Sequence, residues 1–397
     1  MSGTTEPFVP FYRPSITDAE IAEVVDTLRS GWLTTGPKTR RLEEEFAAFV
    51  GSPNALAVNS ATGALHVALA ALGIGPGDEV ITTPMTFVST VTCIEHVGAT
   101  PLLVDVEQDT LNLNPAAVEK ALKTGGHSVR AVLPVHLYGH PCDMDPLLDL
   151  ATTYDLRVVE DAAHALPARY RGRMVGTLGD LAAFSFYATK NMTTAEGGML
   201  TGPPELLTEA STWSLHGISR HAWMRYSEAG SWHYDVIHPG FKYNMTDIQA
   251  ALGIQQLRRL PDMQRRREAI VRRYNEAFAK LEQIDLPPCR SEVEHAWHLY
   301  VLRLNLARLT VDRDGFIEAL RHRGIGCSVH FIPVHLHSYY RQRYGFQPED
   351  FPIAFQEYQR IVSVPLFPGM ADVEVDRVID AVTRTALRYS KPTSESS

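Results

Sequence analysis

Short apolar runs alternate with stretches of helical periodicity over roughly the first 250 residues of the chain. The runs are continuous rather than alternately apolar and polar, which is typical of strands buried on both faces. Strands that alternate with helices predict a mainly parallel sheet with right-handed crossovers. The expected strands span residues 55–58, 79–82, 101–106, 131–137, 157–159, 182–186 and 198–201.

Two helices are expected before this region. Thr17 and Glu20 form a capping box, because each side chain can satisfy a backbone N–H group of the other. Apolar residues then follow at helical spacing. A second helix is expected over 40–50, after an irregular segment at 31–37.

A second, smaller unit is expected in the C-terminal part. A long helical pattern contains Pro261, which predicts a kink or break, and continues over 264–281. The expected strands are 298–304, 326–330 and 361–365, and the expected helices are 312–323 and 372–389. We therefore expect a large α/β domain at 1–250 with an N-terminal helical segment, an α+β domain at 251–390 with the connecting helix, and a disordered tail at 391–397.

Composition narrows the class of protein. The chain is 45% hydrophobic and 21% charged, as in globular proteins, and its net charge of −9 without a basic block argues against nucleic acid as a partner. Its four cysteines form no Cys-x-x-Cys pair, so neither a zinc site nor a disulfide framework is expected, and no metal is. No secretory pattern and no apolar run of about 18 residues occurs, so we expect a cytoplasmic protein without membrane contact.

Lys190 is the first candidate for chemistry. It lies between an apolar, strand-like run and a glycine-rich turn, so it is expected at the mouth of a sheet. Its amine would be desolvated there, and a lowered pKa would make the nitrogen a nucleophile toward an aldehyde. Pyridoxal 5′-phosphate needs such a lysine for its covalent attachment. The alternative is a solvated lysine in a surface loop.

A second candidate is the turn at residues 57–66. It reads as strand, turn and helix, which puts Ala61, Thr62 and Gly63 at a helix N-terminus. Free N–H groups and the helix dipole favour a phosphate there. The alternative is an ordinary helix start with Thr62 as its cap.

Asp161 and His164 follow an apolar strand. Open α/β sheets bind ligands at the carboxyl ends of their strands, and Asp161 lies at such an end. A carboxylate there can keep a pyridine nitrogen protonated. His164 could bond the phenolic oxygen of the cofactor. The alternatives are an N-cap for Asp161 and a satisfied buried histidine for His164.

Two further side chains fit the same cofactor. Phe87 follows the Thr-Pro stretch after a strand and could stack on an aromatic ring, although core packing is an equally ordinary role. Ser185, five residues before Lys190, offers a hydroxyl for the phosphate.

Together these segments resemble the DegT/DnrJ/EryC1/StrS family of nucleotide-sugar aminotransferases. The most specific motifs lie at 160–164, 185–198 and 239–251, and the resemblance covers nearly the whole chain. It implies the fold type I of pyridoxal phosphate enzymes, a mainly parallel large-domain sheet with a smaller C-terminal α+β domain.

The resemblance also implies site roles and partners. Lys190 would bind the cofactor covalently, Asp161 would pair with the pyridine nitrogen, and Phe87 would stack on the ring. Ala61, Thr62 and Ser185 would hold the phosphate. Asn244 would reach the phosphate of the other subunit, so a homodimer with shared active sites is expected. The cofactor would pass through pyridoxamine 5′-phosphate during turnover.

Two departures bear on the reaction. His164 stands where many members have glutamine, and Ala195 stands where glycine is common. Both resemble 4-aminotransferases, which implies transfer from glutamate to C4 of a nucleotide-linked 4-keto-6-deoxy sugar in antibiotic or polysaccharide biosynthesis. Thymidine diphosphate is the favoured carrier and uridine diphosphate the next. The alternatives are a pyridoxal phosphate-dependent dehydratase, in whose relatives histidine replaces the lysine, and a non-catalytic sugar-nucleotide-binding relative. The candidate substrate contacts are Trp32, Tyr187, Asn191, His216, Trp223, Arg225, His330 and His335.

Overall fold

A seven-stranded sheet lies at the centre of the N-terminal part. The structure is a computed structural model that describes residues 7–125, 128–218 and 234–392. The strand order is β1-β9-β8-β5-β4-β2-β3. The bounds are β1 Asn54–Val58, β2 Glu79–Thr82, β3 Thr100–Leu103, β4 Val129–Val132, β5 Arg157–Asp161, β8 Leu181–Ser185 and β9 Gly198–Gly202. Within this sheet β9 alone runs opposite to the other six strands, so the predicted α/β class with a mainly parallel sheet is confirmed.

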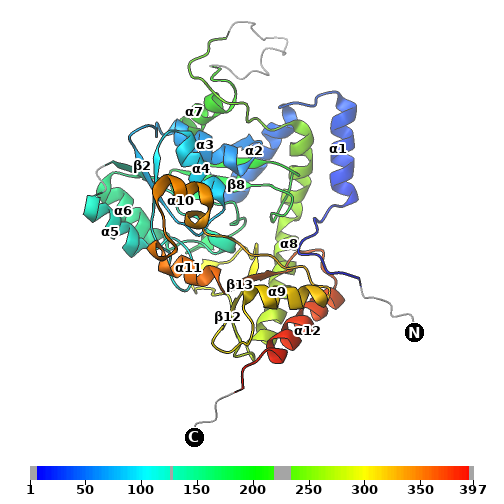
Figure 1. Ribbon diagram of the computed structural model, residues 1–397. Coiled ribbons are helices and arrows are strands. Elements are labelled where there is room, and N and C mark those ends of the chain that lie inside the picture. The colour runs from blue at the N-terminus through cyan, green and yellow to red at the C-terminus, as the bar shows by residue number, and fades with distance from the viewer. Residues whose placement is uncertain (1–6, 126–127, 219–233, 393–397) are drawn as a thin grey trace.

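Helices cover both faces of the sheet (Figure 1). One face carries α3 (Ala61–Ala71), α4 (Val88–His96) and α7 (Pro204–Ser214), and the other carries α2 (Pro37–Val50), α5 (Pro115–Gly125), α6 (Met144–Tyr154) and the first half of α8 (Asp247–Phe278). Successive strand residues point to opposite faces, so Val158 packs in one core and Val159 in the other. Burial on both faces explains why the strands are continuous apolar runs in the sequence.

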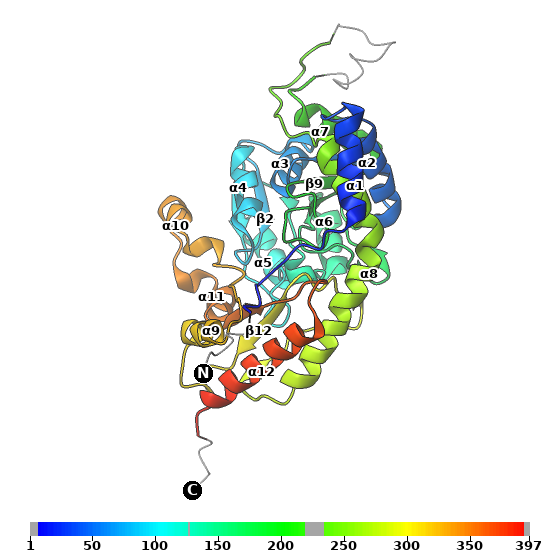
Figure 2. The same cartoon turned by 90° about the vertical axis from the view of Figure 1, so that its right-hand side faces the viewer.

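The N-terminal helix α1 (Asp18–Ser30) begins where the capping box predicts. The N–H of Thr17 donates to the Glu20 carboxylate at 2.8 Å. Figure 2 shows α1, α2 and α8 along one edge of the molecule, and the dark blue segment before α1 extends toward the C-terminal part. The first residues therefore join the two parts of the chain.

The long helix α8 continues through Pro261, so the predicted break is wrong. The proline removes one backbone hydrogen bond, but Leu257, Leu260 and Met263 are buried around it in the large core. Packing of this face holds the helix together across the proline.

The C-terminal part has its own small sheet and core. The sheet has the order β10-β12-β13, with bounds Ile284–Asp285, Tyr300–Leu304 and Ile361–Val364. Around it lie α9 (Arg313–His322), α10 (Ser338–Tyr344), α11 (Pro352–Tyr358) and α12 (Asp372–Arg388). The predicted strand at 326–330 is wrong: Ser328 makes a single bridge with Ser363, because the neighbouring Gly326 N–H is bonded to Val9 of the N-terminal segment.

A further small sheet links the two parts. It consists of β11 (Val293–Glu294), β6 (Arg169–Tyr170) and β7 (Arg173–Met174). The predicted domain boundary near residue 250 falls in the first turn of α8 and stays a prediction. Residues 393–397 of the predicted tail lie outside the described residues.

Candidate active site

Lys190 follows β8 in a tight turn. Its N–H donates to the carbonyl of Tyr187 at 2.9 Å, and the Tyr12 hydroxyl donates to the Lys190 carbonyl at 3.1 Å. Burial lowers the pKa of the Lys190 amine from its usual 10.5 to about 8, while the charge of Asp161 acts in the opposite direction. The amine is therefore far more often neutral near pH 8 than that of a solvated lysine, which favours the nucleophile over the surface alternative.

Asp161 ends β5 and is buried. Its Oδ2 accepts a hydrogen bond from the Thr90 hydroxyl at 2.7 Å, and its Oδ1 accepts one from the Ala163 N–H at 3.1 Å. Burial raises the pKa of Asp161, which these hydrogen bonds oppose. Residues 162–168 form turns rather than a helix, so the N-cap alternative is wrong. Thr90, on α4, was not predicted, because nothing in the sequence pairs it with a strand 71 residues away.

The turn before α3 has the features of an anion site. The cap of α3 is Ser60, whose hydroxyl accepts from the Gly63 N–H at 3.0 Å, so the alternative role of Thr62 as the cap is wrong. The first N–H groups of the helix, those of Ala61 and Thr62, have no partner within it. With the positive end of the helix dipole, they fit a phosphate group.

Gly198 lies directly beneath this turn. A Cβ on it would come within 2.5–2.7 Å of backbone atoms of Ser60 and Ala61, so only glycine allows the approach. Gly198 also pairs with Ser185 at the end of β8. The Ser185 hydroxyl, which accepts from the Tyr187 N–H at 3.4 Å, therefore lies near the same helix N-terminus.

His164 is buried beside Lys190. The backbone N–H of Tyr138 donates to its Nδ1 at 3.3 Å, so the proton of the neutral ring is on Nε2. Burial and the charge of Lys190 hold the pKa of His164 well below its usual range. The ring lies 4.4 Å from that of His298. Neither Tyr138 nor His298 was predicted, since the left-handed turn at Tyr138 and the contact between the two rings depend on tertiary structure.

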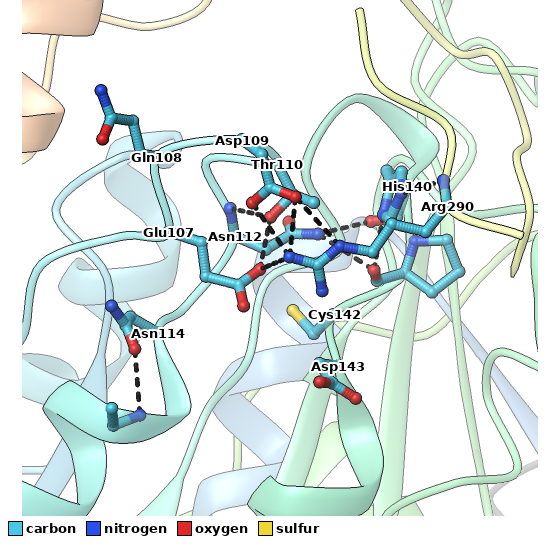
Figure 3. Close-up of polar contacts among 12 residues, drawn as sticks. Glu107, Gln108, Asp109, Thr110, Asn112, Asn114, His140, Cys142, Asp143 and Arg290 are labelled. Atoms are coloured by element: carbon cyan, nitrogen blue, oxygen red, sulfur yellow. Dashed lines mark hydrogen bonds and ion pairs between the residues drawn. The ribbon is translucent and has the colours of Figure 1, made fainter. Parts of the chain in front are cut away.

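Asn112 holds the loop that carries Tyr138. Figure 3 shows its amide directed at this loop, where Nδ2 donates to the carbonyls of His140 and Pro141, both at 3.0 Å. Its Oδ1 accepts from the Leu137 N–H at 2.9 Å. The loop is thereby fixed on both sides of Tyr138.

Two aromatic side chains lie exposed near the site. Phe87 precedes α4 and is 56% exposed, and its ring lies 5.7 Å from that of Phe331. This exposure opposes simple core packing for Phe87 and leaves a ring free to stack on a ligand. Tyr187 is 47% exposed.

A second group of candidates lines a pocket of about 880 Å³. Trp32, His216 and Asn244 all contribute to it, whereas Lys190 does not. Asn244 Nδ2 donates to the Thr35 hydroxyl at 2.7 Å, and Lys242 contacts its Oδ1. The candidate residues therefore fall into two groups on this chain.

The remaining candidates differ in what they can reach. His330 bonds the Ser363 hydroxyl at 2.8 Å, and burial lowers its pKa to about 4. His335 is fully buried, with its ring 4.9 Å from Phe351, which favours packing over substrate contact. Asn191 uses its amide for three internal hydrogen bonds, which favours a positioning role. Trp223 and Arg225 lie outside the described residues.

The described part of the chain holds neither a metal-binding cluster nor a membrane span. Among residues 7–125, 128–218 and 234–392, no group of three or more His, Cys, Asp or Glu side chains is placed to hold a metal ion. In the same part of the chain, no helix is long and apolar enough to cross a membrane.

Comparison with known proteins defines the class. SpsC of Bacillus subtilis, a spore coat polysaccharide biosynthesis protein, is 52% identical over 377 residues, which cover 94% of this chain and 96% of SpsC. The PMP form of Spr1654 from Streptococcus pneumoniae, described as a sugar aminotransferase, matches with a TM-score of 0.89 and 37% identity over 96% of this chain and 99% of that one. DesV of S. venezuelae matches with a TM-score of 0.86 and 36% identity over 96% of this chain and 99% of DesV.

The fold and these matches define an aminotransferase of fold type I that depends on pyridoxal 5′-phosphate. The profile of the DegT/DnrJ/EryC1/StrS aminotransferase family matches residues 14–383. The chain belongs to this family, whose members act on small-molecule sugar substrates. The resemblance noted in the sequence is confirmed, and the non-catalytic alternative is not supported.

Proposed function

We propose that the enzyme transfers an amino group from glutamate to the C4 keto carbon of a nucleotide-linked 4-keto-6-deoxy sugar, in deoxyaminosugar biosynthesis. The observation that carries the C4 assignment is His164, which stands where many members of the family have glutamine. In the structure its neutral ring has the proton on Nε2 and can donate to an oxygen beside Lys190. Thymidine diphosphate is the proposed carrier.

The residues present fit the cofactor. Ala61, Thr62 and Ser185 would hold its phosphate, because the open helix N-terminus and the hydroxyls supply donors for an anion. Asp161 would hold a proton on the pyridine nitrogen, and Phe87 would lie against the ring. When bound, pyridoxal phosphate supplies an aldehyde for amines and a ring that withdraws electrons.

Lys190 would then move the proton. Its neutral Nζ would remove the proton from the α-carbon of glutamate and return it to C4′ of the cofactor. In the second half of the reaction it would carry the proton in the reverse direction, to C4 of the sugar. A pKa near 8 suits this work, since the nitrogen must both accept and release a proton near neutral pH.

The second group of residues supports a shared site. Asn244, Trp32 and His216 line a pocket to which Lys190 does not contribute. We infer that these side chains complete the site of the partner in a homodimer, with Asn244 directed at the partner's cofactor phosphate. Such interfaces are isologous, so each protomer would give and receive the same residues.

One assay tests the reaction. The enzyme is incubated with glutamate and a panel of 4-keto and 3-keto sugar nucleotides, and products are identified by mass spectrometry and NMR. Amination at C4 with release of 2-oxoglutarate is expected. Ammonia release without an aminated sugar would favour the dehydratase, and amination at C3 would reject the assignment to C4. Lys190→Ala should lose the absorbance of the covalently attached cofactor and all turnover.

Mixed dimers test the sharing of the site. Lys190→Ala and Asn244→Ala proteins are each expected to be nearly inactive. When they are mixed and exchange subunits, half of the dimers carry one intact site, so about a quarter of the wild-type activity should return. If no activity returns although subunits exchange, Asn244 serves its own chain.

A further inference from the structure

The N-terminal segment at residues 7–13 is anchored on the C-terminal part of the chain (Figure 2). Val9 forms a parallel β-bridge with Ile325, in which its N–H and its carbonyl each make a hydrogen bond of 2.8 Å. Four residues further on, Arg13 Nη2 donates to the Glu374 carboxylate of α12 at 3.1 Å. The segment is therefore attached to the C-terminal part at two points.

Between these two points the segment brings two aromatic residues to the candidate site. The ring of Phe11 stacks on that of His330, with centroids 5.3 Å apart and planes at 24°. The ring of Tyr12 contacts Phe367 edge-on, with centroids 5.9 Å apart. The Tyr12 hydroxyl donates to the backbone carbonyl of Lys190 at 3.1 Å. A side chain that rests on the C-terminal part therefore holds the residue that follows β8 of the large sheet.

The Tyr12 hydroxyl is a donor near neutral pH. Burial raises the pKa of Tyr12 above its usual 10, and the charge of Arg267 opposes this rise without reversing it. The hydroxyl stays protonated, and a backbone carbonyl can only accept from it. The Lys190 N–H donates in turn to the Tyr187 carbonyl at 2.9 Å. Both backbone polar groups of Lys190 are therefore held by hydrogen bonds.

We propose that Tyr12 is a positioning residue that sets the place of the Lys190 amine by holding the Lys190 carbonyl. The inference rests on the proposed function, in which Lys190 is the reactive amine. The flexible stem of a lysine begins at its Cα, so a displaced backbone displaces the amine. A displacement of about 1 Å can slow a reaction about 100-fold, because the reacting atoms no longer meet in the required geometry. The N-terminal segment thereby couples the C-terminal part to the reactive lysine.

The test follows the attachment of pyridoxal phosphate to protein freed of cofactor. A related chain has been solved in an apo form, so this state is accessible to the fold. In this step the Lys190 amine condenses with the aldehyde and one water molecule leaves. Full-length protein is mixed with increasing concentrations of pyridoxal phosphate, and the absorbance of the attached cofactor is followed by stopped flow. The concentration dependence gives a limiting rate constant and a half-saturating concentration.

A pair of tyrosine variants isolates the hydrogen bond. Tyr12→Phe removes one hydroxyl and keeps the ring against Phe367. Its limiting rate constant should fall at least about fivefold, because the Lys190 carbonyl is no longer held. Its half-saturating concentration should stay within about twofold of wild type, since the phosphate turn before α3 is unchanged. Tyr274→Phe is the matched control: Tyr274 also donates to a backbone carbonyl, that of Pro365 at 2.9 Å in the C-terminal core, and its loss should change neither value.

Hydrogen exchange reports on the lysine turn without the cofactor. In Tyr12→Phe the peptide that contains Lys190 should exchange faster than in wild type, while the other peptides of the large sheet keep their rates. Tyr274→Phe should leave the exchange of the Lys190 peptide unchanged. A purely structural role of Tyr12 would instead speed exchange throughout the C-terminal part and leave the limiting rate constant as it is.

Three results would overturn the proposal. A limiting rate constant of Tyr12→Phe within about twofold of wild type would show that the bond does not position the amine. Equal losses in Tyr12→Phe and Tyr274→Phe would assign the effect to loosening of the C-terminal part. Borohydride reduction and peptide mapping identify the lysine that carries the cofactor, and attachment elsewhere would overturn the role of Lys190 in the proposed function as well. Attachment at Lys190 with unchanged rates would overturn the role of Tyr12 alone, so the two failures are distinguishable.

Discussion

Replacing Glu160 with glutamine should destabilise the protein strongly, although glutamine has nearly the same shape. Glu160 is fully buried one residue before Asp161. Its Oε1 accepts from the N–H groups of Leu178 and Gly179, both at 2.9 Å. Its Oε2 accepts from the Gly176 N–H at 3.2 Å and from His136 Nε2 at 3.0 Å. One carboxylate therefore joins the end of β5 to two separate loops.

The arrangement leaves no place for an amide NH₂ group. His136 Nδ1 accepts from the Cys142 N–H at 3.0 Å, so the ring proton is on Nε2 and points at Glu160. In Glu160→Gln one carbonyl oxygen can retain two of the four bonds, but the NH₂ group faces two other donors. If the His136 proton moves to Nδ1, the same conflict appears at Cys142.

The expected loss follows from these contacts. A hydrogen bond to a charged group contributes about 1.5–3 kcal/mol, so two lost bonds cost about 3–6 kcal/mol of a total stability of roughly 5–15 kcal/mol. With an unfolding entropy of about 2.1 cal/mol/K per residue, the melting temperature should fall by roughly 4–7 °C.

Thermal unfolding followed by circular dichroism measures this loss. Glu119→Gln is the matched control, since Glu119 is exposed and forms an ion pair with Lys123, and it should change the melting temperature by less than about 1 °C. Burial acts to raise the pKa of Glu160, but the bonds from His136 and the backbone outweigh it and lower the pKa. This stability is present above the usual pKa of glutamate and is lost as the pH falls through the lowered value, so the two proteins should converge in acid. A Glu160→Gln variant that melts within 1 °C of wild type at pH 7 would refute the reasoning.

Three further predictions concern the site. Asp161→Asn keeps the size of the side chain but loses the charge proposed to hold the pyridine proton, so kcat should fall by about two orders of magnitude or more in steady-state kinetics; a loss under threefold would contradict that role. Gly198→Ala should weaken cofactor binding at least about tenfold in absorbance titrations, because its Cβ would meet backbone atoms within 2.7 Å. In the control Gly125→Ala the new Cβ has no atom within 4 Å, so this variant should bind the cofactor as tightly as wild type. The rate of reductive trapping of pyridoxal phosphate on Lys190 should rise about tenfold per pH unit below the pKa of about 8 and level off above it, because the ammonium form has no lone pair. An inflection of this rate near 10.5 would show that the amine is solvated.

The sequence predicted the large sheet well because its strands are buried on both faces. All seven expected runs are strands, and each lies within a few residues of its predicted position. Errors arose where tertiary contacts outweigh local preference. Pro261 stays within α8 because buried neighbours hold the helix. In 326–330 the Gly326 N–H bonds to Val9 of the N-terminal segment, and Ser328 makes only a single bridge with Ser363, so no strand forms.

The candidate site shows the same difference between features set by local sequence and features set by tertiary contacts. Lys190, Asp161 and Ser185 were predicted because each ends or follows an apolar run. Thr90 and His298 were missed because their roles come from hydrogen bonds across 71 and 107 residues of sequence, which no local pattern records. The cap of α3 was misplaced by two residues, since Ser60 and Thr62 are both ordinary caps and only the backbone conformation distinguishes them.

The reversal of β9 explains why the phosphate turn and the lysine lie together. In a wholly parallel sheet, the strand between β1 and β8 would start at the edge opposite their carboxyl ends. Because β9 runs the other way, its first residue, Gly198, pairs with Val58 at the end of β1 and with Ser185 at the end of β8. Both strands therefore finish beside one glycine, which has no side chain to separate them. The α3 N-terminus and the turn to Lys190 follow directly from these two ends, so the distance from anion site to amine is set by strand register rather than by loops.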